Sequence, residues 1–87
     1  MTMYKLEPTK AFAKALKKLS GNEQKMVGSK LNILAKDPFH PSLRTKKVQR
    51  LKGVFEASVN MDIRILWKYN GDRLLLLIDI GHHDILG

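Results

Sequence analysis

The chain has 87 residues, which corresponds to one domain with one modest core. Sixteen Lys and Arg against eight Asp and Glu give a formal charge of +8, which favours a polyanionic partner, either nucleic acid or an acidic protein. The absence of cysteine excludes disulfides and thiolate metal sites, and no apolar run reaches membrane-spanning length. We expect a single soluble domain over residues 1–87, located in the cytoplasm and without a signal peptide.

The first half of the chain has helical periodicity after a short strand. Phe12, Leu16 and Leu19 recur at the spacing of a helix that buries one face. Ser20-Gly21-Asn22 ends this helix and offers an N-cap for a second one. The expected elements are a strand at 4–6 and helices at 9–19 and 23–36. So short a turn between helices predicts an antiparallel helical hairpin.

In the second half the period changes to two. Residues 55–60 and 62–69 alternate between apolar and polar, and a third strand over 73–81 is almost wholly apolar. Asn70-Gly71 is typical of a two-residue type I′ turn, which requires positive φ at both positions. The predicted cross-strand pairs are Tyr69 with Asp72, Trp67 with Leu74, Ile65 with Leu76, and Ile63 with Ile78. The predicted class is therefore α+β, with the N-terminal strand and helical hairpin packed on one face of a small antiparallel sheet.

The same register predicts a charged second face. It places Asp62 opposite Asp79, and Arg64 diagonal to Asp79. Continued alternation past Gly81 puts His83 on this face and His82 on the other, and a bulge at Gly81 would exchange them. The residues expected on this face are Lys52, Glu56, Ser58, Asp62, Arg64, Asp79 and His83.

A run of cations precedes the predicted sheet. No acid lies between His40 and Lys52, and the cations there are Arg44, Lys46, Lys47, Arg50 and Lys52. Such a run is usual in a solvated loop, but it also suits the phosphates of RNA.

These residue types fit RNA cleavage without a metal or other cofactor. A base must take the proton of the ribose 2′-hydroxyl, an acid must protonate the leaving 5′-oxygen, and cations must stabilise the phosphorane. His83 or His82 suits proton transfer, and Arg64 suits the phosphate because its planar fork bonds two oxygens. Asp62 could act as the base or hold Arg64 in place.

Structural roles are the alternatives. Arg64 could form only a cross-strand ion pair with Asp62 and Asp79, His82 could cap or pack, and His40 could be an ordinary loop residue. Adjacent His82, His83 and Asp84 diverge on a strand, which argues against a metal site.

Several segments together resemble the RelE/ParE superfamily of toxins, and the histidines are most similar to its RelE/YafQ branch. They are Phe12-AKALKK-Leu19, Arg50-LK-Gly53, Phe55-EASVNMDIRIL-Trp67 and Ile80-GHHDI-Leu86. The resemblance implies a fold like that of small microbial ribonucleases and a toxin that cuts mRNA in the ribosomal A site. It also implies an acidic antitoxin that holds the toxin inactive, with operator DNA bound only through the antitoxin complex.

The resemblance also suggests site residues. His40 matches a loop histidine of YafQ-like toxins, Asp62 an acid, Arg64 a strand arginine, and His83 the C-terminal catalytic histidine. Ser58 stands where family members often have a second histidine, and Gly87 where an aromatic residue usually follows. Two rival functions are a ParE-like poison of DNA gyrase and a nucleic-acid-binding module without catalysis.

Overall fold

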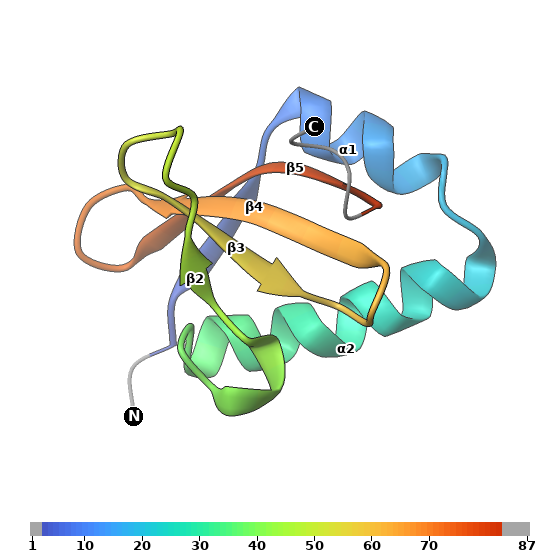
Figure 1. Cartoon of the computed structure of the whole chain (residues 1–87), viewed down its shortest axis with the longest axis horizontal. Coiled ribbons are helices and arrows are strands. Elements are labelled where there is room, and N and C mark those ends of the chain that lie inside the picture. The colour runs from blue at the N-terminus through green and yellow to red at the C-terminus, as the bar shows by residue number, and fades with distance from the viewer. Residues whose placement is uncertain (1–2, 83–87) are drawn as a thin grey trace.

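The computed structural model describes residues 3–82, in which a five-stranded sheet is covered on one face by two helices (Figure 1). The strands are β1 (Lys5–Pro8), β2 (Lys46–Lys47), β3 (Val54–Ser58), β4 (Ile63–Tyr69) and β5 (Leu74–His82). The helices are α1 (Lys10–Lys17), α2 (Gly21–Lys36) and the short 3₁₀ helix η1 (Pro41–Leu43). The strand order is β1-β5-β4-β3-β2, in which β1 is parallel to β5 and every other pair is antiparallel. The predicted α+β class is confirmed, and the parallel β1 makes the sheet mixed.

Side-chain caps begin both main helices. The Thr9 hydroxyl accepts a hydrogen bond from Phe12 N (3.1 Å) and donates one to Ile78 O (2.9 Å), which ties the start of α1 to β5. Ser20 and Glu23 form a reciprocal capping box at the start of α2. The helices run in opposite senses along the sheet, as the sequence predicted (Figure 1). Among the described residues, no helix is long and apolar enough to cross a membrane.

The main core lies between the helices and the sheet. Ile63, Ile65 and Trp67 of β4 face the helices and are almost completely buried, as predicted. Burial of Trp67 also agrees with its predicted place in the core. The other buried members of this core are Phe12, Val27, Leu34, Leu43, Ala57, Val59, Leu75, Leu77 and Ile80.

The predicted β4–β5 register is wrong. Tyr69 pairs with Leu75 and not with Asp72, because the strands are joined by four residues, 70–73, rather than two. Asn70 N donates to Leu74 O (2.8 Å) to close this loop, and only Gly71 of the Asn-Gly pair has a positive φ, of 85°. The observed pairs are Trp67 with Leu77, Leu66 with Asp79, Ile65 with Ile80, Arg64 with Gly81, and Ile63 with His82.

An irregularity in this ladder changes which side chains share a face. The register shifts between Leu66 and Trp67, whose partners are Asp79 and Leu77, so Ile78 is the extra residue of a bulge. Ile78 packs on a second cluster of buried residues formed by Val48, Val54 and Leu66. The face of the sheet away from the helices, predicted to be charged, therefore has an apolar centre.

Candidate active site

The observed register keeps Glu56, Ser58, Arg64 and Asp79 on the face away from the helices, as predicted, but gives them other cross-strand partners. Arg64 lies opposite Gly81 and Asp79 lies opposite Leu66, so Asp79 is still diagonal to Arg64, as predicted, whereas the expected pairing of Asp62 with Asp79 does not form. Asp62 precedes β4 and directs its carboxylate toward His82. His83, the leading histidine of the sequence prediction, lies outside the described residues.

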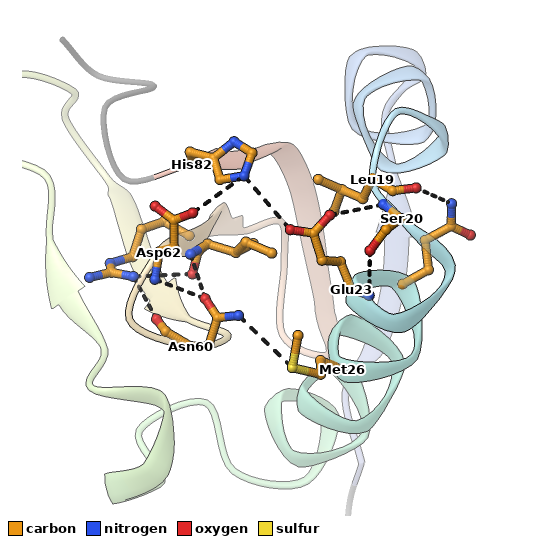
Figure 2. A network of polar contacts seen from close by, with 10 residues as sticks. Leu19, Ser20, Glu23, Met26, Asn60, Asp62 and His82 are labelled. Atoms are coloured by element: carbon orange, nitrogen blue, oxygen red, sulfur yellow. Dashed lines mark hydrogen bonds and ion pairs between the residues drawn. The ribbon is translucent and has the colours of Figure 1, made fainter.

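His82 lies between two carboxylates from different parts of the chain (Figure 2). Its Nε2 is 3.4 Å from Asp62 Oδ2 and 3.7 Å from Glu23 Oε2. Because Ile63, the partner of His82 in the ladder, faces the helices, the imidazole also points to the helix side and reaches α2. This agrees with the prediction that His82 projects away from Asp79. We call these three residues the His82 cluster.

Glu23 is fixed in the cluster by the helix cap. Ser20 N donates to Glu23 Oε1 (2.8 Å), while Ser20 Oγ accepts from Glu23 N (3.1 Å). The bond from the Ser20 backbone is the main reason that the pKa of the Glu23 carboxyl lies below its ordinary value of 4.5, and His82 adds a smaller lowering. Glu23 therefore presents an ionised carboxylate to the imidazole near neutral pH.

The turn between β3 and β4 connects the His82 cluster to Arg64. Asn60 Oδ1 accepts from the backbone N–H groups of Asp62 and Ile63, each at 2.8 Å. The Asn60 carbonyl accepts from Arg64 Nη1 (2.7 Å). Asn60 thus sets the position of Asp62, which contacts His82 (Figure 2), and its carbonyl also holds the Arg64 guanidinium.

Arg64 lines a cavity of about 290 Å³ that opens beside this turn. We call it the basic pocket; its lining residues are Lys30, Ser42, Arg44, Ser58, Val59, Asn60, Met61 and Arg64. Three cations and no carboxylate line it. Behind it, Arg64 Nε is 3.7 Å from the nearly buried Glu56, which Lys46 also approaches at 3.6 Å. The pocket therefore has a positive potential suited to an anion.

His40 lies beside the basic pocket and contacts one of its lining residues. Its Nδ1 accepts from Ser42 N (3.1 Å) and is 2.9 Å from Ser42 Oγ. A neutral ring with this contact carries its proton on Nε2, as assigned from the hydrogen bond. His40 is thus the N-cap of η1, a structural role that the sequence left open alongside a catalytic one.

The five predicted RNA-binding cations do not form one patch of equivalent residues. Arg44 enters the basic pocket, and Lys46 pairs with Glu56. Lys47, Arg50 and Lys52 are exposed on the β2–β3 hairpin, where they border shallow grooves.

Three contributors escaped the sequence analysis: Glu23, Lys30 and Asn60. The spacing of Ser20 and Glu23 is that of a capping box, which was a usable signal for the helix start but not for the contact with His82. Lys30 had no signal, because it is one of several lysines on its helix. No group of three His, Asp or Glu side chains within residues 3–82, the His82 cluster included, is arranged to hold a metal ion.

No protein-family model and no curated protein sequence matches the chain. Solved structures do match. A RelE–RelB complex from Pyrococcus horikoshii OT3 superposes with a TM-score of 0.79 at 17% identity, covering 97% of this chain and 99% of the other. The chain has the RelE/ParE toxin fold.

Two further structures with the RelE/ParE fold support this assignment. YafQ from E. coli strain BL21(DE3) gives a TM-score of 0.78 at 20% identity, covering 95% of this chain and 97% of the other. A YoeB/ParE toxin from Agrobacterium tumefaciens gives 0.79 at 13%, covering 91% and 98%. The likeness extends over nearly the whole of each chain, so the resemblance predicted from the sequence is confirmed for the fold.

Proposed function

We propose that this protein is the toxin of a toxin–antitoxin pair and cleaves mRNA in the ribosomal A site by metal-independent acid–base catalysis. The observation that carries the proposal is that the β3–β4 turn joins the His82 cluster to the basic pocket. A proton-transfer group and an anion-binding site are then adjacent. RNA cleavage by attack of the ribose 2′-oxygen on the neighbouring phosphate requires both. The RelE/ParE fold supports the toxin role.

The geometry suggests how His82 would act. A neutral imidazole with its proton on Nε2 keeps that proton directed at Asp62 and Glu23. Nδ1, which has no partner among the described residues, is then available to accept the 2′-hydroxyl proton. Asp62 and Glu23 serve to orient the ring, as a carboxylate does in a catalytic triad.

Arg64 would stabilise the charge of the phosphorane. Two backbone carbonyls hold its Nη1, so the guanidinium is oriented before RNA arrives. Arg44, Lys46, Lys47, Arg50 and Lys52 would bind flanking phosphates. We assign the second proton transfer, to the leaving oxygen, to His83 or His40.

Primer extension on mRNA undergoing translation in a purified system tests this function. We expect new 5′ ends within the A-site codon. His82→Ala should slow cleavage by about 10²–10⁴-fold and Arg64→Ala by about 10²–10³-fold, the usual cost of losing a proton-transfer group or an oxyanion contact. Lys14→Ala, which removes a charge from the exposed surface of α1, is the matched control and should cleave normally.

Other results would select the rival functions. Inhibition of DNA gyrase supercoiling without mRNA cleavage would indicate a ParE-like poison. Binding of RNA without cleavage by the wild-type protein would indicate a module that lacks catalysis.

We further propose an acidic antitoxin as the partner. The charge of +8 favours such a protein, and similar structures include a RelE–RelB complex and the E. coli DinJ–YafQ complex. Operator DNA would be bound through the antitoxin.

A further inference from the structure

Lys30 and Arg44 line the basic pocket beside Arg64, and the proposed reaction gives Lys30 no role. Within residues 3–82, neither side chain makes a hydrogen bond or an ion pair, although Lys30 is half-buried. Lysine is rarely buried unless it is paired. Two unpaired cations beside Arg64 leave the pocket ready to bind an anion.

The pocket is preformed on the side of Arg44. This residue has φ of 48°, in the left-handed region that non-glycine residues seldom adopt. Its N–H donates to Pro41 O (3.2 Å), and the neighbouring Thr45 hydroxyl donates to Pro38 O (2.5 Å). The backbone that carries the guanidinium is therefore held in place before any ligand binds, which reduces the entropy lost on binding.

Size and polarity narrow the class of ligand. A cavity of about 290 Å³ is at the lower end of small-molecule sites and suits one nucleotide rather than a duplex. Ser42 and Ser58 are among the lining residues, and a serine hydroxyl can bond to a sugar. A 2′-hydroxyl contact of this kind distinguishes RNA from DNA.

Met61 adds an apolar surface at the mouth. It is 91% exposed at the turn between β3 and β4, so no packing in the fold accounts for it. A thioether side chain makes favourable contacts with flat aromatic rings. A base whose phosphate is in the pocket could rest against it.

We propose that the basic pocket is a subsite for one nucleotide of single-stranded RNA next to the cleaved bond. Lys30 and Arg44 bind its phosphate, Ser58 contacts its 2′-hydroxyl, and Met61 contacts its base. This assignment rests on the proposed RNA-cleaving function, but it concerns binding and is tested without cleavage.

The test is a titration of the full chain with an RNA trinucleotide that carries 2′-O-methyl groups at its first two sugars, leaving only the last 2′-hydroxyl free. Lys30→Gln should weaken binding on the order of tenfold and reduce the salt slope by about 0.7, the loss expected for one phosphate contact. Lys25→Gln removes the same charge from the same helix, outside the pocket, and should stay within about twofold of wild type.

Two further measurements keep the proposal testable even if Lys30→Gln does not fold. In the wild-type protein, the Met61 methyl NMR signal should shift on adding the trinucleotide, and Arg44→Gln should repeat the effect of Lys30→Gln. Equal losses for Lys30→Gln and Lys25→Gln, or an unshifted Met61 signal, would overturn the subsite. Ser58→Ala should reduce the preference for RNA over a DNA trinucleotide, and an unchanged preference would overturn the 2′-hydroxyl contact.

The two proposals fail separately. If trinucleotide binding depends on Lys30 but translated mRNA is not cleaved, the nuclease function is refuted and the nucleotide subsite is retained. If His82→Ala abolishes cleavage while Lys30→Gln changes neither cleavage nor trinucleotide binding, only the nucleotide subsite is refuted.

Discussion

Glu23 performs two tasks with one carboxylate, since Oε1 accepts from the Ser20 backbone while Oε2 approaches His82. The first task is encoded locally, by a serine three residues before a glutamate. The second depends on where β5 ends, which no local pattern states. This is why the sequence offered a cap for the helix at Ser20 but missed the contact of Glu23 with the histidine.

The local task leads to a pH-dependent prediction. Because the folded pKa of Glu23 lies below its ordinary value of 4.5, Glu23 stabilises the fold above about pH 4.5. This contribution is lost as the pH falls through the folded pKa. Ser20→Ala should lower the free energy of unfolding by about 0.5–2 kcal/mol near neutral pH, the usual cost of losing an N-cap. It should also raise the pKa of Glu23, since the hydroxyl bond that favours the ionised carboxyl is lost.

Chemical denaturation from about pH 6 to about pH 3, with NMR titration of the Glu23 carboxyl, measures both effects. Ser29→Ala, an exposed serine of the same helix, is the control and should match wild type in both. A Glu23 pKa that is equal in wild type and Ser20→Ala would refute the contribution of the Ser20 hydroxyl and leave only the backbone bond as a cause of the lowered pKa.

At the scale of elements, the strands were predictable and their register was not. Alternation identified β3 and β4 because each has polar markers on one side. Residues 74–78 are all apolar and fit either face, so only the turn could choose the register. The loop has four residues instead of the predicted two, which exchanges the faces of Leu74 to Leu77. The bulge at Ile78 exchanges the faces a second time for the residues that follow. The longer loop and the bulge together leave Asp79 and His82 on their predicted faces, but with cross-strand partners that the two-residue turn did not predict.

The loop itself can be tested by comparing glycines. Gly71→Ala should lower the free energy of unfolding by about 1–2 kcal/mol, because alanine is strained at φ of 85° although the added methyl meets no atom within 4 Å. Asn70→Ala should cost about 0.5 kcal/mol or less, because Asn70 has no positive φ and keeps its backbone bond to Leu74. Gly28→Ala, inside α2 with equally open space, should instead raise the free energy by about 0.5–1 kcal/mol.

Urea denaturation of the three variants provides these values. Equal costs at Asn70 and Gly71 would mean that both residues have left-handed conformations. That result would support the two-residue type I′ turn predicted from the sequence, and its register, instead of the four-residue loop.

At the scale of the whole molecule, the sheet has a buried apolar cluster on each of its two faces. The main core packs under the helices, while Val48, Val54, Leu66 and Ile78 hold the basic β2–β3 hairpin to the opposite face. Composition and periodicity were enough to predict one core with helices on it. They could not predict the second cluster, because Val48 and Val54 lie in a run otherwise dominated by cations, and Leu66 occupies a position that alternation assigned to the polar side.

If this second cluster holds the hairpin, its loss should loosen the hairpin before the rest of the fold. Leu66 is 5% exposed, so Leu66→Ala should lower the free energy of unfolding by about 2–3 kcal/mol. Amide exchange at Val48, whose N–H donates to Val54 O (2.9 Å), should accelerate more than exchange in α2. Leu75→Ala, in the main core, should accelerate both alike, and Leu51→Ala, an exposed leucine of the same hairpin, should change neither. Equal acceleration at Val48 and α2 in Leu66→Ala would show that the hairpin and the helical layer open as one unit, and that the basic surface is not held separately.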